Sequence, residues 1–215
     1  MNWDWPKKKR FNQKTIAIIA VLMAVTIVFV VLEGVFPKFS TGGTIEIHFL
    51  PIILVSFITG FLVSFTFGII TSLLAILLVP SSSGWLINPV QVILDYNLPY
   101  IIPALVINLF KIFFFKNDLT AFNNFSKSKK IIYLEIVFII IFLINFVLHV
   151  ISGALYFAPS NSNWQNWKVW ANSLVLNSYY MVGTYLFFAI FLPIPISFLI
   201  DYYQNSQNIN CDQKL

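Results

Sequence analysis

Long, mainly apolar runs are the feature that most restricts what this chain can fold into. Such runs cover residues 16–32, 101–115 and 131–150, and a helix needs about 20 mainly apolar residues to cross a bilayer. Of the 215 residues, 59% are hydrophobic and 10% are charged, whereas soluble domains carry roughly 25% charged residues. The composition excludes a soluble domain. The runs do not alternate in polarity, which disfavours the strands of a membrane β-barrel.

Turn and charge signals divide these runs into six expected spans. The spans cover residues 15–32, 48–59, 61–79, 89–115, 131–155 and 172–200. The second span is short, and Pro193 and Pro195 are expected to kink or loosen the end of the sixth. The prediction is an all-α integral membrane bundle of six transmembrane helices over residues 15–200. A basic N-terminal segment (1–14) and a polar tail (201–215) flank it.

The basic residues indicate how the bundle is oriented. Five precede the first span, five lie in or beside the connection between spans four and five, and Lys214 lies in the tail. Lys38 and Lys168 fall on the opposite side. Cytoplasmic loops carry the excess of Lys and Arg, so both termini are predicted to be cytoplasmic. The net charge of +5 is thereby explained by topology, and no nucleic-acid partner is expected. The single cysteine, Cys211, provides no disulfide framework.

Polar residues recur at helical spacing in the last three spans. The stripes are Asn88, Gln91 and Asp95 in the fourth span, Asn145, His149 and Ser152 in the fifth, and Ser173, Asn177, Tyr180 and Thr184 in the sixth. Asp95 lies about six residues inside its span, or roughly 9 Å at the helical rise, and His149 and Asn177 lie at similar depths. Polar groups in a membrane usually face a bundle interior or a site. The stripes therefore predict a polar cavity open to the outside, and hydrogen bonding between helices is the alternative.

Charge and aromatic residues suggest what such a cavity binds. The Asp95 carboxylate needs a cation, and the nearby spans supply only His149, so a cationic ligand would fit. Tyr96 and Phe157 could stack on a flat cationic ring. Three ionisable residues flank the first outer loop, namely Glu33, Glu46 and His48. All three are expected at solvated helix ends, and Glu46 or His48 is a weaker candidate for a lid.

Small residues form a strip on the first span at Ala17, Ala20 and Ala24. Small residues let membrane helices approach closely. The strip could serve packing within the bundle or contact with a partner protein, and spacing alone does not choose between them.

Three segments carry a resemblance to a known family. They read GGTIEIHFLP over residues 42–51, NPVQVILDY over 88–96, and HVISGA over 149–154 followed by SLVLN over 173–177. The chain resembles the substrate-binding S components of energy-coupling factor (ECF) vitamin transporters, specifically the thiamine branch. The resemblance implies a six-helix protein of the bacterial plasma membrane that captures thiamine from outside. It also implies a transmembrane coupling subunit and two ATPase subunits as partners.

The resemblance also implies roles for individual residues. Asp95, Tyr96, His149, Phe157 and Asn177 match positions of the thiamine pocket, and Gln91 joins them through its stripe. Asn172 stands where the family usually has a tyrosine, five residues before the site asparagine. Ala20 and Ala24, together with Ala17, match the docking face for the coupling subunit.

Several alternatives stay open at this point. A thiamine precursor, a phosphate ester or another vitamin could be the ligand, although no cluster of Lys or Arg lies near the predicted site. An intramembrane enzyme would use His149 and Asp95 as acid and base, but the chain has no motif of that kind. A secondary carrier would need a polar path through the inner half of the bundle, which is almost without polar residues. The chain also lacks a phosphate-binding loop, so ATP hydrolysis is assigned to partners. No catalytic residue, metal or cofactor is expected, with thiamine as the transported ligand.

Overall fold

The computed structural model describes residues 13–35, 43–78, 88–115, 122, 125–158, 163–193 and 196–197. Within this part of the chain all regular elements are helical, as predicted. They are α1 (Gln13–Val35), α2 (Phe49–Ile58), α3 (Phe61–Leu78), α5 (Pro89–Val92), the π-helical turn η1 (Ile93–Asn97), α6 (Leu98–Phe115), α8 (Lys127–Tyr156) and α9 (Trp167–Phe191). Most of the predicted N-terminal segment and the whole tail lie outside the described residues.

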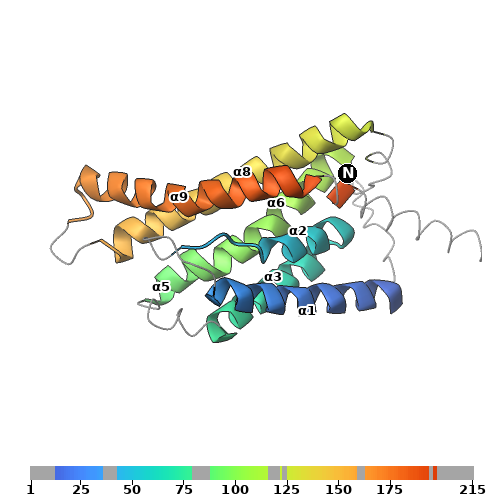
Figure 1. Ribbon diagram of the computed structural model, residues 1–215, viewed down its shortest axis with the longest axis horizontal. Coiled ribbons are helices and arrows are strands. Elements are labelled where there is room, and N and C mark those ends of the chain that lie inside the picture. Colours follow the sequence, from blue (N-terminus) through green and yellow to red (C-terminus); the bar gives the residue numbers. More distant parts are fainter. Residues whose placement is uncertain are drawn as a thin grey trace, which may run out of the picture.

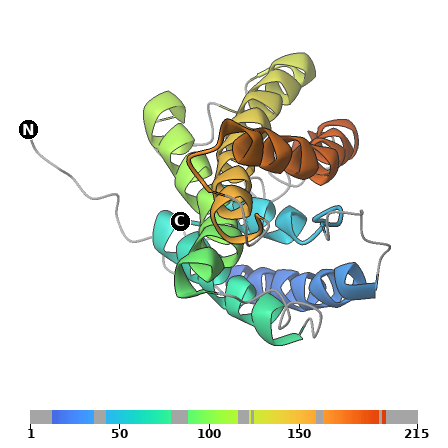
Figure 2. The ribbon, with the colours of Figure 1, turned by 90° about the vertical axis from the view of Figure 1, so that its left-hand side faces the viewer.

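The helices form an elongated bundle (Figure 1). Helices α8 and α9 pack along one side, α1 and α3 along the other, and α2 and α6 lie between them, as the view along the bundle shows (Figure 2). Seven of the ten residues of α2 are buried, and Phe49, Ile52 and Ile53 are fully enclosed. The short second span is therefore the centre of the fold.

Five stretches are long and apolar enough to cross a membrane. They are Thr15–Val35, Phe61–Leu78, Pro89–Phe115, Lys127–Tyr156 and Trp167–Phe191. Their outer faces expose large apolar side chains such as Leu62, Leu77 and Phe113, which suits contact with lipid chains. Helix α2 has ten residues, or about 15 Å, which is too short to span a bilayer alone. The six predicted spans thus correspond to five long helical stretches and one short helix.

The fourth span contains a local widening at the level of Asp95. The Leu98 N–H donates to the Ile93 carbonyl, five residues earlier, across η1. Pro99 follows directly; proline has no N–H, and its ring crowds the carbonyl four residues before it, here that of Asp95. Wide turns of this type are frequent at functional sites. The turn therefore places Asp95 and Tyr96 in non-standard helical geometry.

The C-terminal end of α2 is closed by a buried lysine. Lys111 of α6 is 6% exposed, and its Nζ donates to the carbonyls of Ser56 at 2.8 Å and Thr59 at 2.5 Å. The last carbonyls of a helix have no partner within the helix, so the ammonium group satisfies them. Lys111 is one of the five basic residues predicted in or beside the cytoplasmic connection between spans four and five, and the structure buries it instead.

The sixth span is interrupted near its end, where the two prolines predicted a kink or loosening. Helix α9 stops at Phe191, where the Leu192 N–H donates to the Phe188 carbonyl. Helical residues follow at 193 and 196–197, and the Ile196 N–H donates to the Leu192 carbonyl at 3.0 Å. Pro193 lies two residues beyond this end. A proline cannot donate to the preceding turn, which accounts for the stop.

Candidate functional site

Asp95 lies at the centre of a hydrogen-bonded cluster between η1, α5 and α8. Gln91 Nε2 donates to Asp95 Oδ2 at 2.8 Å, and Ser152 Oγ donates to the same oxygen at 2.7 Å. His149 Nδ1 lies 3.1 Å from Asp95 Oδ1. Gln91 and Ser152 are fully buried and His149 is 8% exposed. Three side chains from two elements thus orient one carboxylate.

Local sequence explains how these side chains meet. Residues three or four positions apart lie on one helix face, which pairs Gln91 with Asp95 and His149 with Ser152. Asn88 begins α5 as an N-cap, and its Oδ1 accepts from the Val90 N–H at 2.8 Å. The cap sets the start of α5 and thereby the rotation of Gln91 toward the cluster.

Asn177 of α9 extends the cluster across the contact between α8 and α9. Its Nδ2 donates to the Ser173 carbonyl at 2.8 Å and to the His149 carbonyl at 3.3 Å. Tyr180 Oη donates to Asn177 Oδ1 at 2.8 Å, and the Tyr180 ring meets His149 edge-on at a centroid distance of 5.7 Å. Side chains of the three predicted polar stripes therefore meet at one level of the bundle.

A close approach of α8 and α9 makes this geometry possible. A Cβ atom on Gly153 would lie 2.3 Å from Ser173 Oγ and 2.9 Å from Asn177 Nδ2. Ser173 Oγ donates to the Val150 carbonyl at 2.8 Å. A side chain at position 153 would occupy the space that these two polar groups need.

The irregular segment 43–48, before α2, brings Glu46 to the cluster. The Glu46 N–H donates to Thr184 Oγ1 of α9 at 3.2 Å, and a Cβ on Gly43 would overlap the Tyr180 ring. Atom Oε2 of Glu46 is buried, and the carboxyl group interacts electrostatically with His149 and Asp95. The expectation that Glu46 lies at a solvated helix end is therefore wrong.

Glu33 and His48 form a second buried pair, between α1 and the start of α2. Glu33 Oε2 lies 2.6 Å from His48 Nδ1, and Glu33 Oε1 accepts from the His48 N–H at 2.7 Å. The residues are 8% and 2% exposed, and the Tyr100 ring stacks on the imidazole at 4.4 Å. Both were expected at solvated ends, and both expectations are wrong.

Three other expected binding residues lie in different settings. Tyr96 is half-buried in η1 beside Asp95. Phe157 is the C-cap of α8 and is 37% exposed, and Asn172 is exposed on α9 five residues before Asn177. The hydrogen bonds of the cluster run through Gln91, Asp95, His149 and Asn177 instead.

The alanine strip of α1 faces away from the bundle. Ala17, Ala20 and Ala24 are all exposed. Of the two uses considered for the strip, packing within the bundle is contradicted by this exposure.

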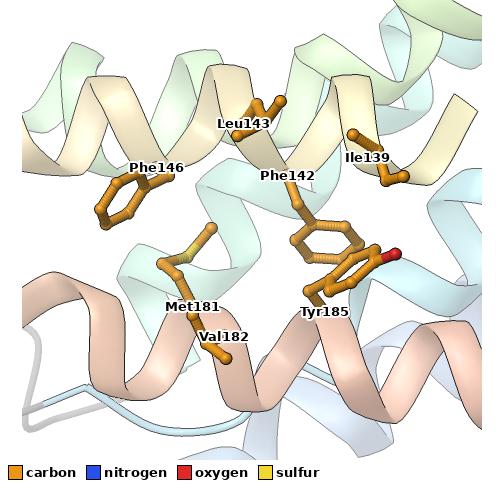
Figure 3. A pocket seen from close by; sticks show the side chains of 7 residues that line it. All are labelled: Ile139, Phe142, Leu143, Phe146, Met181, Val182 and Tyr185. Atoms are coloured by element: carbon orange, nitrogen blue, oxygen red, sulfur yellow. The ribbon is translucent and has the colours of Figure 1, made fainter. Parts of the chain in front are cut away.

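A separate apolar pocket of about 220 Å³ lies between α8 and α9 (Figure 3). It is lined by Ile139, Phe142, Leu143, Phe146, Met181, Val182 and Tyr185. The Tyr185 hydroxyl is the one polar side-chain group of this lining, so the pocket offers no counter-charge to a cation. No group of three or more His, Cys, Asp or Glu side chains in the described part of the chain could hold a metal ion. The Asp95 cluster is the better candidate site for a charged, polar ligand.

Comparisons with known proteins identify the family and the fold of this chain. The thiamine transporter ThiT of Bacillus subtilis (strain 168) is 30% identical over 177 residues, which cover 81% of this chain and 85% of that protein. The solved structure of ThiT from Listeria monocytogenes has the same fold, with a TM-score of 0.64 and 22% identity over 88% of this chain and 99% of that one. Residues 16–204 match the thiamine transporter protein family. With that match over most of its length, the chain belongs to the thiamine transporter family of multi-pass membrane proteins.

Proposed function

We propose that this protein is the high-affinity thiamine-binding subunit of an ECF-type uptake transporter and takes its ligand from outside the cell. The observation that carries the proposal is the convergence of Asp95, His149 and Asn177 on one buried polar cluster in a chain of the thiamine transporter family.

Thiamine has two chemical parts that suit the residues of the cluster. Its aminopyrimidine ring both donates and accepts hydrogen bonds, and we assign it to Asp95, His149, Asn177 and Gln91. Its thiazolium ring is flat and cationic, which suits cation–π contact with Tyr96 and Phe157. Asn172 lies on the same helix as Asn177 and is assigned to the outer rim. Ligand sites of this size are mostly apolar with a few placed polar groups.

A six-crossing topology with both termini in the cytoplasm is part of the proposal. Residues 43–46 are extended and would cover about 13 Å, and the turn and helix over 47–58 would add about 18 Å. Together they approach the roughly 30 Å of a bilayer core. The extended part lies against α9 and continues into α2 in one direction (Figure 1). Non-helical backbone is tolerated at membrane depth where protein surrounds it, and the bond from Glu46 to Thr184 supports such a setting.

The charges at the two bundle ends support this orientation. Lys127, Lys129 and Lys130 lie in the first turn of α8, and Lys168 lies at the first turn of α9, at the opposite end of the bundle (Figure 1). By the excess of basic residues on cytoplasmic sides, we place the start of α8 in the cytoplasm and the bundle in the cell membrane.

Active uptake would require partner subunits. We assign the exposed strip of Ala17, Ala20 and Ala24 to docking with a transmembrane coupling subunit, because small side chains permit close approach between membrane helices. Two ATPases would then supply the energy, and this chain would bind the ligand without acting as an enzyme.

Calorimetric titration of the purified protein in detergent, without ATP, tests the proposal. We expect saturable, stoichiometric binding of thiamine, and weaker binding of its pyrimidine precursor and of thiamine monophosphate. The cluster residues Gln91, Asp95, His149, Ser152 and Asn177 contain no lysine or arginine to hold a phosphate. Tighter binding of the precursor or the phosphate ester would transfer the assignment to that ligand. No binding of any of the three would refute the assignment.

A further inference from the structure

Three carboxyl groups of the bundle lie close enough to interact electrostatically, and they differ in what surrounds them. They belong to Glu33, Glu46 and Asp95. We propose that Glu46, and not Asp95, supplies the negative charge that the cationic ring of the ligand neutralises. This inference rests on the proposed function, and it names the group at that site that selects for a positive charge.

Asp95 already has protein partners on both oxygens. Oδ2 accepts from Gln91 and Ser152, and Oδ1 lies beside His149 Nδ1. A carboxylate with three donors is well satisfied in a buried setting. Its role in the site is to fix the orientation of His149 and to present a defined polar edge to the ligand.

Glu33 is satisfied in the same way, by one residue. Both of its oxygens contact His48, one through the backbone N–H and one through the ring Nδ1. Glu33 therefore holds the start of α2 against α1, and its charge is already matched by donors.

Glu46 lies between these two satisfied pairs and lacks such a donor. Its Oε2 is buried without a hydrogen-bond partner among the described residues. The carboxyl group interacts electrostatically with His149 on one side and with His48 on the other. Since burying an unpaired charge is costly, this position favours a ligand that brings a positive charge.

The two imidazoles that interact with Glu46 each carry an unpaired nitrogen. Each uses Nδ1 for its carboxylate, and in each the Nε2 on the opposite ring edge is buried without a described partner. His48 and His149 are both more than nine-tenths buried, and buried polar groups nearly always have partners. Two imidazole nitrogens and one carboxylate oxygen are thus buried without a described partner, in three side chains that interact electrostatically.

A charge-selectivity experiment tests the role of Glu46. Titrations would compare thiamine with its neutral isostere, in which carbon replaces the positively charged ring nitrogen, on wild type and on Glu46→Gln. Wild type is expected to prefer thiamine at least tenfold. In Glu46→Gln the affinity for thiamine should fall at least tenfold while that for the neutral isostere stays within threefold, so the preference disappears.

Two further variants complete the design. Asp95→Asn should weaken both ligands by similar factors, because it disturbs hydrogen bonds that both share. Glu135→Gln is the matched control: Glu135 is a carboxylate of α8 fourteen residues before His149, about 21 Å along the helix, and it should change neither affinity. Monodisperse elution and retained binding of the neutral isostere show that a variant is folded.

The outcomes separate the two proposals. Suppose that wild type binds thiamine and that Glu46→Gln still prefers thiamine over the neutral isostere. The role of Glu46 is then refuted, even if both affinities fall, and the proposed function stands. The same holds if the preference disappears in Asp95→Asn instead. If wild type binds neither ligand, the proposed function itself fails, and with it this inference.

Discussion

Gly153→Ala is the substitution whose effect can be worked out most directly from the structure. The added methyl group would lie 2.3 Å from Ser173 Oγ, 2.9 Å from Asn177 Nδ2 and 3.4 Å from Ser173 Cβ. The last contact is only slightly tight, but the first two are far too short, so both polar groups must move. Ser173 would lose its bond to the Val150 carbonyl, and Asn177 would lose its contact with Ser173 Oγ.

The magnitude follows from these losses. Two hydrogen bonds contribute about 1–3 kcal/mol together, and Ala offsets roughly 0.5–1 kcal/mol because it is the better helix former. The net loss of folding stability should be about 1 kcal/mol. The effect on binding should be larger, since Asn177 is displaced from the cluster, and we expect about a tenfold weaker affinity for thiamine, or about 1.4 kcal/mol.

The assay is calorimetric titration of thiamine combined with thermal unfolding in detergent. Gly60→Ala is the control, because a Cβ on Gly60 would meet nothing within 4 Å, and it should bind as wild type does. Adding Ser173→Ala to Gly153→Ala removes the shortest contact, so the double variant should recover part of the lost affinity. Wild-type affinity in Gly153→Ala, or strictly additive losses in the double variant, would refute the reasoning.

Two further predictions concern parts of the fold away from the cluster. Lys111→Met removes an ammonium group that closes the end of α2 through two short bonds, so it should destabilise the fold by roughly 2–3 kcal/mol, measured as a lower Tm; an unchanged Tm would contradict the capping role. Ala24→Trp places a large ring on the exposed strip of α1, so thiamine titration should match wild type while uptake in cells and co-purification with a coupling subunit are lost. Intact co-purification would contradict the docking assignment.

Much of the fold could be predicted from the sequence because the membrane imposes simple rules. Apolar runs of span length predicted α1, α3, α6, α8 and α9, and the break at Gly60 correctly separated α2 from α3. The interruption after Phe191 was predictable because Pro193 and Pro195 lack the N–H that a regular helix needs, and a helical bond from the Ile196 N–H to the Leu192 carbonyl follows it. Hydropathy measures the preference for lipid and does not report such a break.

The site was predictable where its members share helical spacing. Asp95, His149 and Asn177 fall on the polar stripes, and helix geometry brings such stripes together. Glu46 and His48 were misplaced because they lie in residues 43–48, which have no periodic pattern. Glu46 contacts Thr184 of α9, 138 residues later, and His48 packs against Glu33 and Tyr100. Lys111 was misjudged for a similar reason, since a charge count cannot distinguish a solvated ammonium group from one bonded to carbonyls. Partners distant in sequence leave no local signal.

The wide turn η1 makes the site depend on chain length as well as on residue type. A π-helical turn holds one residue more than a regular α-helical turn, so deleting one residue of Ile93–Asn97 would let the helix close into regular α geometry. A deletion between Gln91 and Asp95 would change their spacing from four residues to three, and a deletion after Asp95 would change the spacing of both from Pro99. Either deletion would alter how the carboxylate is held without changing the identity of Gln91. Relatives of this chain should therefore conserve the number of residues between Gln91 and Pro99 more strictly than the apolar side chains among them, and an alignment gap at this place should mark a protein with a different pocket.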